Sequence, residues 1–204
     1  FIDADCVPAR DWLASVRRAA ARADLVGGRV SVFDETPPPR TGAQAFEAVF
    51  AFDCRTYVEK KGIAVTANLV TRRGVFEEIG LFKNGVSEDA EWTQRAISKG
   101  HSLVYAHELH VGHPSRSDWS ALRRKWRRLT EEAYAMDRLL GRHKSRWVLK
   151  AIMMPVSVLV HLPRIYRHDR LHSWDERWRA TATMARLRIL RMVWMLRQAA
   201  GLPI

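Results

Sequence analysis

The α/β class of this chain is visible in residues 1–33, FIDADCVPARDWLASVRRAAARADLVGGRVSVF. An apolar strand end runs into Asp3 and Asp5, and the apolar residues of 12–23 recur at helical spacing. Residues 24–33 have the composition of a buried strand. Strand, helix and strand in this order are typical of α/β folds.

The same alternation continues to residue 114. We expect a loop over residues 34–40, where three prolines are consecutive, then helical, strand and helical segments over 43–59, 62–73 and 74–80. Ser87 precedes a further predicted helix over 88–99, and a strand follows at 101–106.

After Pro114 the apolar period is purely helical. One predicted helix runs from Trp119 to Leu140, and another begins after Ser173, with an apolar stripe of Trp178, Ala182, Ala185, Ile189, Met192 and Leu196. We therefore expect two parts, an α/β domain over residues 1–116 and a helical extension over residues 117–204.

The positive charge of the chain lies entirely in the helical part. Residues 1–114 contain 14 basic and 15 acidic residues, a net charge of −1, whereas residues 115–204 contain 20 and 7, a net charge of +13. Six of the eight tryptophans also lie there. Tryptophan beside arginine and lysine suits an anionic membrane surface, although a bundle with solvated basic faces explains the same composition.

Two cysteines, Cys6 and Cys54, are too few for a disulfide framework, which fits a reducing cytoplasm. A membrane-spanning helix needs about 18 to 20 consecutive apolar residues. Residues 147–162 come nearest, but they include Lys150, Pro155 and His161. We expect a kinked buried or interfacial helix there.

Asp3 and Asp5 are the first candidate site residues. Aspartates separated by one residue point to opposite sides of a strand unless the backbone bends. Ligands of α/β proteins bind at the carboxyl ends of strands, so one carboxylate can hold a divalent cation while the other contacts a sugar or ribose hydroxyl. The pair alone is common by chance, so further candidate residues are needed to indicate a site.

Two later segments contain further candidate site residues. Glu88 and Asp89 open a predicted helix, where they either complement the helix dipole or serve as a general base. His110 and His113 follow the predicted strand over 101–106. A histidine in a loop is commonly a surface residue, but imidazole also joins carboxylates on Mn-like ions.

Five segments in a fixed order resemble the second half of family 2 glycosyltransferases of the GT-A fold. They are FIDADC, GGRV, TANLVTRRGVFEEIGLF, SEDAEW and RAISKGHSLVYAHELHVGHPSR, and the similarity covers about residues 1–116. The resemblance implies a partial GT-A sheet, which is Rossmann-like, followed by a helical extension. It also implies an N-terminally truncated fragment, inactive by itself, because relatives begin with further βα units that bind the nucleotide base.

The resemblance also implies a role for each candidate residue. Asp3 and Asp5 would bind the donor, with Asp5 also ligating Mg or Mn. Asp89 would be the catalytic base, with Glu88 as the second choice. His113 would complete the metal site, and Asn68 would line the sugar pocket.

The function that this resemblance implies is inverting transfer of a sugar from a nucleotide-sugar to a polysaccharide or lipid-linked acceptor. The enzyme would act as a peripheral protein at the cytoplasmic face of the cell membrane. The alternative is a non-enzymatic basic module that binds a membrane or nucleic acid. Nucleic acid is the weaker choice, because the aromatic residues fall on core stripes instead of alternating with arginine in a groove.

Overall fold

The computed structural model describes all of residues 1–204, which form two compact units. The first unit contains residues 1–33 and 52–114, and the second contains residues 34–51 and 115–204. From the sequence, residues 34–51 were expected in the α/β part, whereas in the structure they pack with the C-terminal helices.

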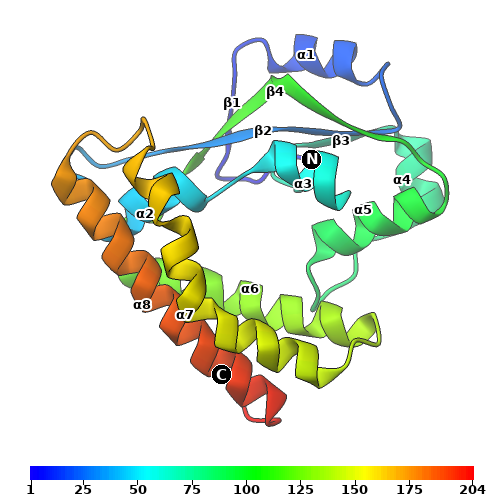
Figure 1. The fold of residues 1–204 in the computed structure, drawn as a ribbon. Coiled ribbons are helices and arrows are strands. Elements are labelled where there is room, and N and C mark those ends of the chain that lie inside the picture. The colour runs from blue at the N-terminus through cyan, green and yellow to red at the C-terminus, as the bar shows by residue number, and fades with distance from the viewer. The chain divides into compact units, whose positions relative to one another are not determined.

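A four-stranded sheet in the order β1-β4-β2-β3 forms the first unit (Figure 1). Its central strands, β2 (Leu25–Phe33) and β4 (Leu103–Pro114), are parallel. The short strands β1 (Val7–Pro8) and β3 (Leu69–Thr71) pair antiparallel with β4 and β2, respectively. The predicted α/β class is therefore confirmed.

The last strand, β4, is longer than the sequence predicted. Gly28 of β2 pairs with Ala106, but Arg29 pairs with His110, so three residues of β4 bulge out of the register. Pairing then resumes as far as Pro114. The expectation that His110 and His113 follow the strand was wrong, because both lie within it.

Four helices complete the first unit: α1 (Trp12–Ala19), α3 (Cys54–Lys61), α4 (Arg73–Ile79) and α5 (Glu88–Ser98). The segment predicted as one helix over 43–59 is two, because Asp53 accepts a hydrogen bond from the backbone N–H of Thr56 and starts α3 anew. The core between sheet and helices contains Leu25, Val58, Leu69, Val75, Ile79 and Trp92.

The second unit is helical and consists of α2 (Gly42–Phe50), α6 (Trp119–Leu139), α7 (Lys144–Tyr166) and α8 (Trp174–Ala199). Side-chain caps start all four of them: Thr41 with Gln44 at α2, Asp118 at α6, His143 at α7 and Ser173 at α8. Their core contains Phe46, Val49, Leu122, Ile165, Leu171, Met184 and Leu187.

Helix α7 runs without a break through Pro155 and Pro163. By length and composition alone it is apolar enough to cross a membrane, and only 11% of its most apolar window is buried. No stretch of this kind was expected from the sequence. Its large apolar side chains are exposed along one face, at Leu149, Ile152, Met153, Val156, Leu159 and Val160.

The apolar stripe predicted for α8 is not the face that packs. Trp178 is 66% exposed and Ile189 is 53% exposed, so much of the predicted stripe faces outward. The buried face consists of Ala180, Met184, Leu187, Trp194 and Met195. Apolar residues surround most of this helix, and periodicity alone does not identify the face that a neighbour covers.

Candidate active site

The D-x-D segment forms a tight turn between two points of attachment to the sheet. Ile2 forms a bridge to Asn68, and the backbone N–H of Cys6 donates to the carbonyl of Asp3 at 3.0 Å. Val7 then pairs with Gly112 of β4. The turn therefore supplies the backbone bend that allows Asp3 and Asp5 to face one site, and it places Cys6 beside His113.

His113 is a buried side chain that faces this turn. Its Nδ1 lies 2.7 Å from the carbonyl oxygen of Pro114, which can only accept, so Nδ1 carries the proton. Nε2 then presents its lone pair 3.6 Å from Oδ2 of Asp5. A backbone carbonyl that fixes the histidine tautomer in this way is the usual outer partner of a metal-ligating histidine.

Four potential ligand atoms converge at this turn. One each from Asp3, Asp5, Cys6 and His113 lie within 4.8 Å of one another. Two carboxylates and an imidazole suit Mn²⁺, and the carboxylates alone suit Mg²⁺. The donor set therefore fits the predicted cofactor. Cys6 was not among the residues predicted from the sequence, although it directly follows the D-x-D segment.

Asp89 lies in the first turn of α5, and its surroundings favour the protonated form. Burial, followed by the negative charges of Glu88 and Asp3, raises its pKa from the ordinary 3.8 to about 6, against a hydrogen bond from the N–H of Ala90. Asp3 therefore lies near enough to act electrostatically on Asp89. Of these causes, the charge of Asp3 has the smallest effect.

The start of α5 is held in place by Thr93, which was not predicted from the sequence either. Its hydroxyl lies 2.6 Å from the carbonyl oxygen of Asp89 and 3.3 Å from that of Ala64. It also accepts from the N–H of Ala64 at 3.4 Å. This buried hydroxyl ties the candidate base to the loop that precedes Asn68.

Asn68 is fully buried, and its side-chain amide forms hydrogen bonds to other parts of the protein. Its Nδ2 donates to the carbonyls of Arg29 and Leu109, at 3.0 and 2.8 Å, while its Oδ1 accepts from the indole N–H of Trp12 at 3.1 Å. These bonds bind β2, the β4 bulge and α1 together. A donor contact by this side chain stays a prediction, whereas its support of the sheet is visible in the structure.

Close packing around this amide also requires a glycine. A Cβ at position 28 would lie 2.2 Å from Nδ2 of Asn68 and 2.6 Å from the carbonyl oxygen of Leu109. His110, the other candidate histidine, is not in the metal-ligand group. Its Nε2 lies 2.7 Å from the hydroxyl of Ser31, and burial lowers its pKa.

Comparisons with known proteins identify the family of this chain. The family described as "Glycosyl transferase family group 2" matches residues 1–197. Glycosyltransferase AglE of Haloferax volcanii is 30% identical over 206 aligned residues, which cover 98% of this chain. The chain spans 64% of the length of that relative. The mixed α/β sheet with its helices is also consistent with a GT-A-like domain. From this match, together with the order of its motifs, the chain belongs to glycosyl transferase family group 2.

Proposed function

We propose that this chain carries the catalytic site of a metal-dependent, inverting glycosyltransferase. The observation that supports the proposal is that Asp3 lies close enough to Asp89 to raise its pKa, beside the ligand atoms that converge at the D-x-D turn. Three parts of the sequence thereby contribute to the site: the D-x-D turn, the end of β4 and the start of α5.

Asp89 is the proposed general base. With a pKa of about 6 it is mostly ionised at neutral pH, yet it binds a proton more tightly than an exposed aspartate does. It takes the proton from an acceptor hydroxyl as the oxygen of that hydroxyl bonds to the anomeric carbon. The bond from this carbon to the diphosphate breaks on the opposite side, so the anomeric configuration inverts.

Asp3, Asp5 and His113 would hold Mn²⁺, and the two carboxylates alone would hold Mg²⁺. Such an ion supplies positive charge that neutralises the diphosphate leaving group. The protonated Nδ1 of His113 keeps the ring oriented toward Asp5, and the turn at Asp3 keeps both carboxylates on one side. Glu88 has the supporting role of raising the pKa of its neighbour.

The proposed donor is a nucleotide-sugar, and the proposed acceptor is a glycan or a lipid-linked glycan. We further propose that the enzyme acts as a peripheral protein at the cytoplasmic face of the membrane. The net charge of +13 over residues 115–204 and the exposed apolar face of α7 support this location. They support an anionic membrane surface better than nucleic acid, because the side chains of α7 that are exposed over residues 149–160 are apolar.

Transfer assays on the full-length protein test this proposal. Nucleoside diphosphate released from a panel of nucleotide-sugars is measured with membrane lipid extract as acceptor, for wild type, Asp89→Asn and Asp5→Asn. Both variants should lose transfer while their far-UV circular dichroism stays unchanged. Asp11→Asn is the matched control, because Asp11 is exposed and paired only loosely with Arg18, at 3.9 Å. Wild-type rates in either site variant would remove the assignment.

A further inference from the structure

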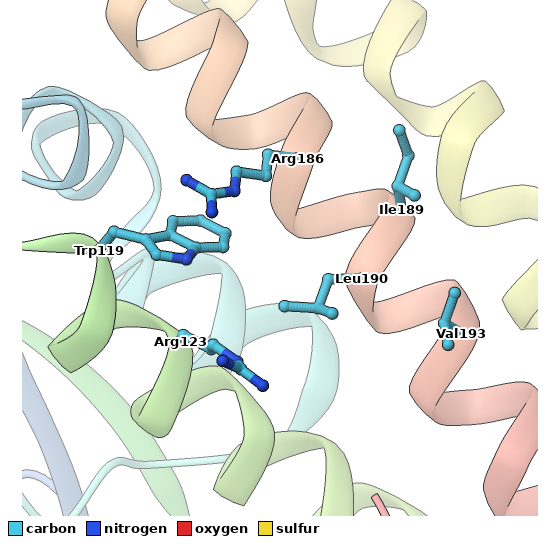
Figure 2. Close-up of a pocket in the computed structure, with 6 residues that line it drawn as sticks. All are labelled: Trp119, Arg123, Arg186, Ile189, Leu190 and Val193. Atoms are coloured by element: carbon cyan, nitrogen blue, oxygen red, sulfur yellow. The ribbon is translucent and has the colours of Figure 1, made fainter.

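A pocket of about 390 Å³ lies between helices α6 and α8 of the helical unit (Figure 2). Its volume is within the range of small-molecule sites, about 300 to 1,000 Å³. The residues that line it are Trp119 and Arg123 from α6 and Arg186, Ile189, Leu190 and Val193 from α8. None of them belongs to the proposed catalytic site.

The two arginines of this pocket have no acidic partner, as is also true of Arg124 on α6 and of Arg188 and Arg191 on α8, whereas other arginines of these helices are paired. On α6, Arg127 pairs with Glu131 at 3.1 Å, and on α8, Arg179 pairs with Asp175 at 2.8 Å. Arg123 and Arg186 form no ion pair. The carboxylates of this surface therefore leave two positive charges beside one pocket.

One of these guanidinium groups is oriented by an aromatic ring. Arg186 stacks over the indole of Trp119, 4.0 Å from the ring centroid, and Figure 2 shows Arg123 on the adjacent helix below the same indole. A planar guanidinium that is already oriented loses less entropy when it binds the oxygens of a phosphate. The polar end of the pocket is thus suited to an anion.

The other end of the pocket is apolar and open to solvent. Ile189 and Val193 are 53% and 43% exposed, and they lie one turn apart on α8, beside Leu190. Water leaves these branched side chains exposed, and a small inorganic ion would pair with the arginines without covering the side chains. An alkyl chain attached to a phosphate satisfies both ends at once.

We propose that this pocket binds one anionic phospholipid at the membrane surface, with its phosphate at the end lined by Arg123 and Arg186 and its chain along Ile189 and Val193. The inference rests on the membrane location within the proposed function and not on the transfer reaction. Residues 115–204 carry the net charge of +13 that brings such a surface near. Docking there would place the helical unit at the bilayer through a defined contact in addition to diffuse attraction.

Vesicle co-sedimentation of the full-length protein tests the site. The vesicles contain phosphatidylcholine alone or with phosphatidic acid. Replacing both arginines, Arg123→Gln with Arg186→Gln, should weaken binding to the anionic vesicles by more than about thirtyfold, which is the loss expected for any two surface charges. Arg124→Gln is the matched control, because Arg124 is exposed on α6, carries the same charge and does not line the pocket. Its binding should weaken about fivefold or less, which is the loss expected for any one surface charge.

Two further measurements distinguish a phospholipid site from a simple anion site and from charge alone. Monomeric dihexanoyl phosphatidic acid should raise the melting temperature of the wild type, whereas inorganic phosphate at equal concentration should not. Arg186→Lys should recover part of the vesicle binding lost in Arg186→Gln, because lysine restores the charge but not the planar guanidinium that binds two phosphate oxygens.

Equal losses in Arg124→Gln and Arg186→Gln would overturn the proposal in favour of diffuse electrostatics. Equal stabilisation by inorganic phosphate would overturn it in favour of a simple anion site. Asp89→Asn should bind vesicles as the wild type does, so failure of the lipid site and failure of the transferase proposal give different results.

Discussion

Replacing Asp89 with asparagine should abolish transfer and at the same time stabilise the protein. The carboxyl group has its pKa raised from 3.8 to about 6, first by burial and then by the charges of Glu88 and Asp3. Folding therefore strengthens proton binding, and ionising this group in the folded state costs free energy. The amide of the Asp89→Asn variant carries no charge, and its oxygen can still accept from the N–H of Ala90.

The size of this effect follows from the pKa difference and depends on pH. The cost is absent below the unfolded pKa, grows as pH rises between 3.8 and about 6, and is complete above that. At about 1.36 kcal/mol per pKa unit, the variant should gain about 1.6 kcal/mol near pH 5 and about 3 kcal/mol near pH 7.5.

Urea unfolding of metal-free protein at both pH values measures these differences. Glu88→Gln is the control, since it removes a neighbouring charge and leaves the buried carboxyl in place. It should keep transfer activity and shift the acidic limb of the pH–rate profile to lower pH, because Asp89 then ionises more easily. An Asp89→Asn variant that is less stable at both pH values would refute the reasoning, and loss of transfer in Glu88→Gln would move the base to Glu88.

Three other outcomes are expected. Asp5→Asn should weaken Mn²⁺ binding at least about tenfold, measured by electron paramagnetic resonance, and unchanged affinity would exclude Asp5 as a ligand. Asn68→Ala should lower the free energy of unfolding by about 3 kcal/mol, because it leaves a buried indole N–H and two carbonyls without their partner; a loss below about 1 kcal/mol would contradict its structural role. Glu47→Ala should lower the free energy of unfolding by about 3 to 5 kcal/mol, because buried Glu47 accepts from Lys125 at 2.5 Å, whereas the exposed control Glu131→Ala should lower it by about 0.5 kcal/mol or less. Calorimetry measures both losses, and equal losses would contradict this difference between a buried and an exposed ion pair.

Local chemistry made several elements predictable. Strand β2 is mostly apolar, interrupted by Arg29 and Ser31, and Gly80 ends α4 with a positive φ of 86°, as its position in the sequence predicted. Ser173 caps α8 by accepting from the N–H of Glu176. Ser87 was likewise predicted to cap α5; it is the N-cap residue, but its side chain makes no capping hydrogen bond.

Features set by contacts distant in the sequence were not predictable. The extension of β4 through His113 depends on a bulge that only pairing with β2 reveals. The structural use of Asn68 depends on carbonyls of Arg29 and Leu109, 39 and 41 residues away in the sequence. The outward face of α8 is likewise set by which neighbours cover the helix, since hydrophobic spacing was similar on two faces.

The transferase proposal requires that Asp89 and the metal-ligand group act in one site. Carboxyl ¹³C NMR of the full-length protein can follow the titration of Asp89 with and without Mg²⁺. If the ion binds at Asp3 and Asp5, its positive charge should lower the pKa of Asp89 from about 6, and Asp5→Asn should remove that change. A pKa that stays the same while Mg²⁺ is bound would show that the two groups do not share a site.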